Sequence, residues 1–188
     1  MALPFTTDGG KGVRGTLGLI LLQADETLES EAHELLLMAG LAFHHSRAVM
    51  PPVVTRETLA VMTATVPAAA ALLPRADFDV ISHGCTSGAT VIGPASEVAA
   101  VNGLHPSAKV TDPILALVAA CRMRGLKRLG FVTPYVAMVS AAMRGFLRDA
   151  GLEISAFDRF AQGDDRVVVR IAPASVRGRH EHVGDRAN

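Results

Sequence analysis

The sequence predicts an α/β fold in which parallel strands alternate with helices. The chain has 188 residues, of which 49% are hydrophobic, and this is enough for one compact domain or two small ones. Apolar runs of strand length alternate along the chain with segments of helical periodicity. An alternation of this kind favours a parallel sheet with right-handed crossovers.

The first half of the chain follows the order strand, helix, strand, helix, strand. Residues 16–22, TLGLILL, are an unbroken apolar run, which is typical of a strand buried on both faces of a sheet. A helix is predicted from Thr27 to Met38, because acidic residues gather near its start and Gly40 follows its end. The same reasoning gives a strand at 41–50, an alanine-rich helix from Arg56 to Leu73 and a strand at 78–82.

The second half of the chain continues this alternation. Asp112 is expected to cap a helix that has Pro113 in its first position. A later helix over 136–150 is expected to turn its apolar side chains inward and Ser140 outward. The remaining strands are predicted at 128–132 and 152–157.

Charge and cysteine content exclude several classes of partner. Lysine plus arginine and aspartate plus glutamate both number 18, so no field of one sign attracts nucleic acid or a membrane surface. The apolar runs fall short of the roughly 20 residues that cross a bilayer. Two cysteines make no disulfide framework and the first residues form no apolar leader, so a cytoplasmic location is expected.

Three polar segments follow predicted strands, at 23–27, 84–87 and 133–135. In open parallel sheets, ligands bind beyond the carboxyl ends of the strands, where such segments meet. Cys85 lies in the second segment, HGCTSGAT, where backbone N–H groups and a helix dipole could stabilise a thiolate. The alternative is a small buried hydrophobe, which is common for a free cysteine.

Other cysteine and nucleotide motifs do not match by spacing. A Cys-x5-Arg phosphatase loop needs an arginine where Val91 stands, and a thioredoxin motif needs a cysteine at Gly88. The sequence contains no Walker, HExxH or post-strand GxGxxG motif. A phosphatase, a nucleotide-binding protein and a zinc hydrolase are therefore poor fits.

Longer stretches carry a family resemblance. GLILLQADETLESE, GCTSGATVIG and HPSAKVTDPILALVAACRMRGLKRLGFVTPYVAMVSAAMRGFLRDAGLE resemble the aspartate/glutamate racemase superfamily. The resemblance is greatest to the branch of maleate cis-trans isomerase, arylmalonate decarboxylase and the ectoine-utilisation protein EutA. It runs from about residue 14 to about residue 176.

The resemblance implies an enzyme without a cofactor, made of two Rossmann-like parallel-sheet domains with the active site in the cleft between them. Each domain supplies one cysteine, and the first falls on Cys85. In isomerases of this branch the thiolate adds to the substrate double bond, the new single bond rotates and the thiol leaves; a racemase would instead use two thiols on opposite faces of an α-carbon. The tyrosine of the TPY motif falls on Tyr135, whose phenol can hold a carboxylate or enediolate oxygen.

Two departures from the family affect the expected chemistry. The substrate-binding asparagine of the family falls on Asp25, which would repel a plain dicarboxylate and favours a substrate with an amine or amide. The second cysteine of the family lies beyond the resembling part, and Cys121 is on the inward face of a helix. The chain is therefore expected to be truncated or frame-shifted, with domains at 1–110 and 111–176, the second incomplete, and a disordered tail at 177–188.

Further side chains are candidates for substrate binding. Thr86 and Ser87 either bind an oxyanion or carboxylate or satisfy the backbone of a turn. Thr133 belongs to the TPY motif, and Asp25 could equally cap a helix. No metal site is expected, because adjacent histidines such as those at 44 and 45 point to opposite faces of a strand.

The sequence thus predicts a cofactor-independent isomerase or racemase for a small carboxylate, linked by resemblance to ectoine breakdown and expected to be a homo-oligomer. The alternative is an inactive remnant that binds a small molecule or a partner. A flavodoxin-like binding module would need a phosphate-cradling loop, and the sequence contains no such motif.

Overall fold

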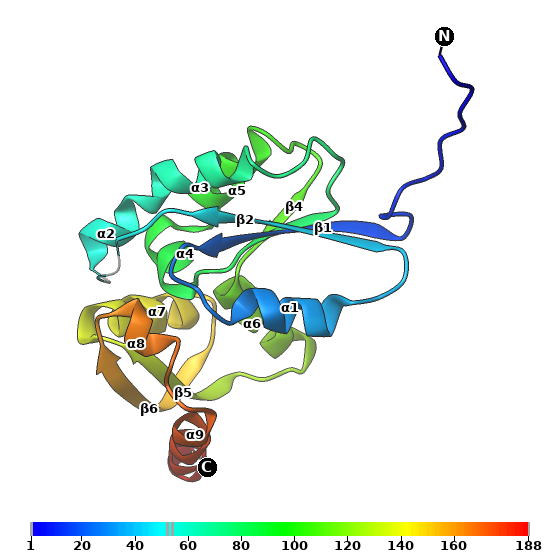
Figure 1. The fold of residues 1–188 in the computed structure, drawn as a ribbon. Coiled ribbons are helices and arrows are strands. Elements are labelled where there is room, and N and C mark those ends of the chain that lie inside the picture. The colour runs from blue at the N-terminus through cyan, green and yellow to red at the C-terminus, as the bar shows by residue number, and fades with distance from the viewer. Residues whose placement is uncertain (1, 52, 54, 188) are drawn as a thin grey trace.

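The fold contains two parallel sheets (Figure 1). The computed structural model describes residues 2–51, 53 and 55–187. The first sheet has the order β2-β1-β3-β4, and the second pairs β5 with β6. The strands are β1 (Gly15–Leu22), β2 (Leu41–Ala48), β3 (Val80–His83), β4 (Lys109–Thr111), β5 (Arg128–Tyr135) and β6 (Glu153–Gln162). The predicted α/β fold with parallel strands is confirmed.

Helices cover both faces of the first sheet. The helices of both sheets, within the described residues and in chain order, are α1 (Leu28–Leu36), α2 (Arg56–Ala60), α3 (Met62–Ala70), α4 (Thr86–Ile92), α5 (Pro94–Asn102), α6 (Pro113–Met123), α7 (Ala137–Asp149), α8 (Asp165–Val168) and α9 (Pro173–Ala187). Leu19 of β1 packs with Ala32 of α1, whereas Ile20 points to the other face and joins the core beneath α3. Because side chains alternate along a strand, this apolar strand supports a helix layer on each side. Figure 1 shows α3 and α5 on one side of the sheet and α1 on the other.

The segment predicted as one helix from Arg56 to Leu73 forms two, α2 and α3. Thr55 caps α2 through reciprocal hydrogen bonds with Thr58. The chain tightens at Val61, whose N–H donates to the Thr58 carbonyl at 3.2 Å. A bond of this i to i−3 kind narrows the helix locally and separates the two segments.

Helix α9 includes most of the segment 177–188, for which the sequence predicted a disordered tail. The helix packs on β5 and β6, below the small sheet in Figure 1. Val183 is 2% exposed, and a Cβ built on Gly130 of β5 would come within 2.8 Å of its Cγ1. The glycine therefore lets the helix approach the strand closely enough to bury its few apolar groups.

The strand order of the first sheet creates a crevice between β1 and β3. The chain leaves β1 toward the face of α1 and leaves β3 toward the face of the main core. Loops that depart in opposite directions leave a crevice at the carboxyl ends of the two strands. No helix among the described residues is both long enough and apolar enough to span a bilayer.

Candidate active site

A pocket of about 300 Å³ lies at this crevice. Segments from both sheets line it: the loops after β1 and β3, the start of α6, the end of β5 and the helix α8. The lining side chains with chemical functions include Asp25, Cys85, Thr86, Tyr135 and Asp165. The pocket thus collects polar groups that are far apart in the sequence.

Cys85 is the N-cap residue of α4 and is 4% exposed. Its Sγ accepts a hydrogen bond from the Gly88 N–H at 3.2 Å and lies 3.6 Å from the Ser87 Oγ. Burial nevertheless raises the pKa of the thiol to about 11, because the two hydrogen bonds offset only part of the desolvation. Burial therefore favours the protonated thiol in the resting site, and the role of Cys85 as a thiolate stays a prediction.

Gly88 allows the close packing around this thiol. A Cβ at this position would lie 2.5 Å from the Met62 Sδ and 3.0 Å from the Cys85 Sγ. Only glycine fits without moving one of the two sulfur atoms. Gly88 is therefore needed for close packing around the Cys85 thiol.

Tyr135 ends β5 and lines the same pocket. The Ser87 side chain, which also contacts Cys85, interacts with this phenol and lowers its pKa in part. Burial raises the pKa of the phenol well above its usual range, and the nearby Cys85 adds to the shift. The phenol therefore keeps its proton and can act as a hydrogen-bond donor.

Thr133 is fully buried and lies behind the pocket. Its Oγ1 accepts a hydrogen bond from the Tyr135 N–H at 3.1 Å and lies 2.8 Å from the Ser140 Oγ. Thr133 positions Tyr135 from behind and is not among the lining residues, so its role in substrate binding stays a prediction. Ser140 was predicted to point outward, and this prediction is wrong because the side chain is buried. The Ser140 hydroxyl on α7 lies within hydrogen-bond distance of Thr133 on β5. The periodicity of the helix sequence alone does not reveal this contact.

Asp25 caps the helix α1 while lining the pocket. Its Oδ1 accepts from the N–H groups of Thr27 at 2.9 Å and of Leu28 at 2.8 Å. Thr86 lines the pocket too, whereas Ser87 is 2% exposed and lies just behind Cys85. Asp25 thus makes the helix-capping hydrogen bonds that the sequence offered as its alternative role, and its carboxylate still lies at the pocket wall.

Asp165 is a pocket residue that the sequence reasoning missed. It begins α8, is 6% exposed, and its Oδ2 has no hydrogen-bond partner among the described residues. Burial raises the pKa of this carboxyl to about 6, and Asp164 and Asp25 add to the shift. Asp165 follows the carboxyl end of β6, and ligands of parallel sheets bind beyond the carboxyl ends of strands. The same rule that selected the other loops could therefore have found this residue.

His83, beside Cys85 in the sequence, points away from the thiol. Its Nδ1 lies 2.8 Å from the Glu97 Oε1, and both side chains are buried. The alternation of side chains along β3 explains why His83 is directed to α5 while the next residues turn toward the pocket. The pair belongs to the core of the first sheet.

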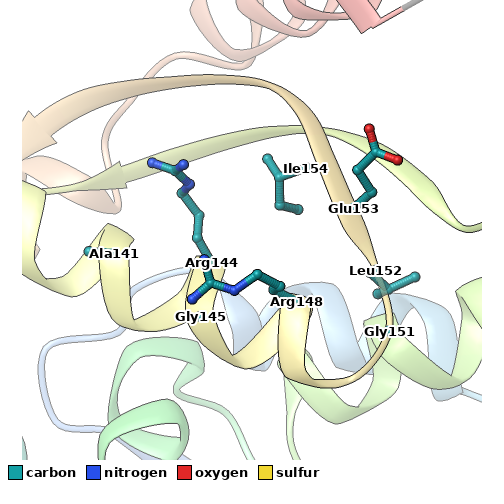
Figure 2. Close-up of a pocket in the computed structure, with 8 residues that line it drawn as sticks. All are labelled: Ala141, Arg144, Gly145, Arg148, Gly151, Leu152, Glu153 and Ile154. Carbon is teal, nitrogen blue, oxygen red and sulfur yellow. The ribbon is translucent and has the colours of Figure 1, made fainter.

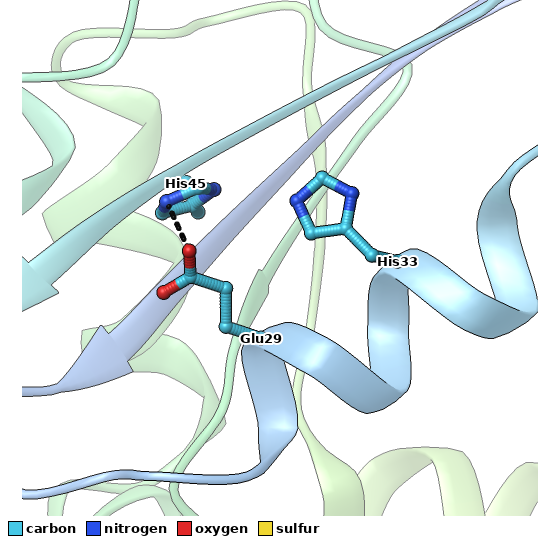
Figure 3. Close-up of side chains that lie close together, drawn as sticks. All are labelled: Glu29, His33 and His45. Carbon is cyan, nitrogen blue, oxygen red and sulfur yellow. Dashed lines mark ion pairs between the residues drawn. The ribbon is translucent and has the colours of Figure 1, made fainter.

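Two other features lie outside this pocket. A larger hollow of about 590 Å³ between α7 and the start of β6 displays Arg144, Arg148 and Glu153 but no nucleophile (Figure 2). Glu29 and His33 of α1 and His45 of β2 hold their ligating atoms within 4.8 Å of one another, a set that could hold a divalent metal ion (Figure 3).

The carboxylate of Glu29 already has partners in this cluster. It lies 2.9 Å from His45 and 2.6 Å from Arg47, so its charge is balanced. The cluster and the larger hollow therefore add no group to the chemistry available to Cys85.

Comparisons with known proteins agree on one group of enzymes. No family model matches the chain. Among curated proteins, maleate isomerase of Pseudomonas putida is 26% identical over 175 residues, which cover 86% of this chain and 70% of that protein.

Solved structures give the same result. One match is Nocardia farcinica maleate cis-trans isomerase, in a cysteine-to-serine variant with a covalently bound succinylcysteine intermediate. Its TM-score is 0.77 and its sequence identity is 26%, and the match covers 87% of this chain and 71% of that chain. Maleate isomerase Iso from Pseudomonas putida S16 matches with a TM-score of 0.75 and 24% identity, over 87% and 71%. Unliganded arylmalonate decarboxylase matches with a TM-score of 0.71 and 20% identity, over 92% and 73%; the last two likenesses show the fold.

Proposed function

We propose that the chain belongs to the branch of the aspartate/glutamate racemase superfamily that contains maleate isomerase and arylmalonate decarboxylase. We further propose that it is an isomerase- or racemase-type enzyme that acts on a small carboxylate through Cys85 without a cofactor. The observation that supports this most is the meeting of Cys85 and Tyr135 at one pocket, with the Ser87 hydroxyl buried beside the thiol. A nucleophile, a hydroxyl and a protonated phenol are the groups that addition to an unsaturated acid requires.

The proposed reaction begins with loss of the Sγ proton of Cys85 to water in the pocket. The sulfur electron pair forms a bond to the alkene carbon remote from the acid group, and the π pair moves into the carboxylate to give an enediolate. The phenol of Tyr135 donates to the enediolate oxygen. Rotation about the new single bond, return of the electron pair and cleavage of the carbon–sulfur bond release the isomer and the Cys85 thiolate, which takes back a proton from water. The succinylcysteine of the Nocardia farcinica enzyme contains a bond of this kind.

Cys121 favours the isomerase over a two-thiol racemase. It is 3% exposed on α6 and is not among the residues that line the pocket. Among the described residues, Cys85 is thus the one thiol at the pocket. A reaction that uses one thiol, which adds and then leaves, fits this chain better than proton transfer between two thiols.

The alternative function is small-molecule binding without turnover. Both functions predict a ligand in this pocket, but only the enzyme converts it. We keep the cytoplasmic location, the homo-oligomer and the link to ectoine breakdown as further proposals, which derive from the sequence and its resemblance.

The test compares Cys85→Ser with Cys121→Ser in full-length protein. Conversion of maleate and of cis-4-aminobut-2-enoate to their trans isomers is followed by proton NMR. We expect Cys85→Ser to lower turnover at least a thousandfold, because a hydroxyl is a poor nucleophile here, and Cys121→Ser to retain it. Turnover that survives in Cys85→Ser contradicts the proposal, and absence of turnover in the wild type supports the binding function.

A further inference from the structure

The pocket of Cys85 is lined by acidic groups without a basic partner. Asp25, Glu31 and Asp165 line it, and no lysine or arginine does so among the described residues. Such a wall repels a plain dicarboxylate and attracts positive charge. Given the proposed function of this pocket, we infer that the substrate is a small carboxylic acid that also carries a cationic nitrogen, bound by Asp25 and Asp165.

Asp165 supplies the observation that points most directly to a ligand. It is 6% exposed, lines the pocket and leaves its Oδ2 without a hydrogen-bond partner among the described residues. A buried carboxylate oxygen without a donor costs free energy unless a ligand supplies one. An ammonium group offers up to three N–H donors to such an oxygen.

The arginines near the pocket do not neutralise these carboxylates. Arg166 lies 2.7 Å from Asp164, and Arg170 lies 2.8 Å from Glu26. Arg47 is bound to Glu29 at 2.6 Å and reaches Asp25 only through the backbone carbonyl, at 2.8 Å. The side chains of Asp25 and Asp165 therefore remain available to a cationic group of the ligand.

The rest of the lining favours an organic cation over a metal ion. Leu22, Leu28, Val168 and Val169 contribute apolar surface to the same pocket. Hard divalent ions take six or more oxygen ligands, many of them water, and apolar side chains supply none. An alkylammonium group instead places its N–H donors on the carboxylates and its methylene groups on the apolar side chains.

A bound cation would also promote the step at Cys85. Burial raises the pKa of the Cys85 thiol, and the negative charge of Asp165 adds to that shift. A positive charge next to Asp165 offsets this contribution, so the thiol ionises more readily when the substrate is present. The same contact that selects the substrate thus activates the nucleophile.

The test measures affinity without turnover. β-Alanine and succinate share a two-methylene spacer and a carboxylate, and differ in whether the other end is cationic or anionic. Their dissociation constants are measured by calorimetry with the full chain at pH 7.5, in buffer with EDTA. We expect β-alanine to bind at least tenfold more tightly, which is about 1.4 kcal/mol. Equal affinities, tighter binding of succinate or no binding of β-alanine overturns the inference.

Matched variants assign the preference to the two carboxylates. Asp165→Asn and Asp25→Asn keep the side-chain shape and should each lower the preference for β-alanine about tenfold. Asp164→Asn changes the neighbouring acid, which is held by Arg166, and should leave the preference unchanged. An equal loss in all three variants contradicts a specific role of Asp25 and Asp165.

The test of the cationic substrate can fail independently of the test of the proposed enzyme function. Cys85→Ser should keep the preference for β-alanine while it loses turnover. If the wild-type protein isomerises its substrate through Cys85 but does not prefer β-alanine over succinate, only the inference of a cationic substrate is rejected. A preserved preference in a protein whose turnover does not need Cys85 would reject the enzyme mechanism alone.

Discussion

Asp165 and Cys85 both have a raised pKa, and burial is the main cause for each. The pKa of the thiol is raised to about 11 and that of the carboxyl to about 6. Neither value could be predicted from the sequence, since the glycine-flanked turn around Cys85 suggested stabilisation of the anion. Whether a side chain is desolvated depends on residues that reach it from other elements, here Tyr135 on β5 and Asp165 on α8.

Asp165→Asn should stabilise the protein in a pH-dependent way. The folded-state pKa of about 6 lies above the ordinary aspartate value of 3.8, so the folded protein holds this proton more tightly than the unfolded chain. The resulting destabilisation is absent below about pH 4 and complete above about pH 6. We expect the variant to gain about 2 kcal/mol in free energy of unfolding at pH 7.5 and little at pH 4.

Urea denaturation at the two pH values measures this difference. Asp164→Asn is the control, because Arg166 lowers the pKa of Asp164 and the variant should show no comparable gain. A gain of equal size at both pH values would show that the carboxyl of Asp165 is not destabilised by its charge.

Tyr135→Phe should distinguish the contribution of the hydroxyl to catalysis from the contribution of the ring to stability. The ring remains to fill its place, so the fold should lose about 1 kcal/mol or less. The donor to the enediolate oxygen is lost, and kcat/KM should fall about a hundredfold. Steady-state kinetics with cis-4-aminobut-2-enoate measure the effect. An unchanged kcat/KM in a folded variant would remove the phenol from the mechanism.

At the scale of elements, the sequence predicted most strands and helices but not the packing of α9. The strand β1 and the cap of α6 by Asp112 follow from local patterns, and the structure agrees. Helix α9 has little apolar surface of its own, and its docking depends on Gly130 in a distant strand. Periodicity within a segment does not reveal such a pairing, which is why a disordered tail was expected.

The pairing of Gly130 with Val183 can be tested by a double-mutant cycle. Gly130→Ala places a Cβ within 2.8 Å of the Val183 Cγ1 and should destabilise the fold by about 1 to 3 kcal/mol. Val183→Ala alone should cost about 1 to 2 kcal/mol by opening a cavity. The double variant should be more stable than the sum of the two losses predicts, because the smaller side chain relieves the clash. Additive losses would contradict the contact between α9 and β5.

At the scale of the whole molecule, the two sheets place their loops around one pocket. The sequence predicted a site at this edge of the sheet, since the ends of parallel strands must meet there, and a pocket lies at this place. It identified Asp25, Cys85, Thr86 and Tyr135, which all line the pocket. It missed Asp165 and did not show that Thr133 lies behind the pocket, because the direction of a side chain in an irregular segment depends on tertiary contacts.

The central claim is that Cys85 forms a bond to the substrate within this pocket. The most direct measurement is peptide-resolved mass spectrometry of protein quenched in acid during turnover of cis-4-aminobut-2-enoate. The account predicts the added mass of one substrate on the peptide that contains Cys85, preserved in Cys121→Ser and absent in Cys85→Ser. An adduct on Cys121, or continued turnover in Cys85→Ser, would contradict it.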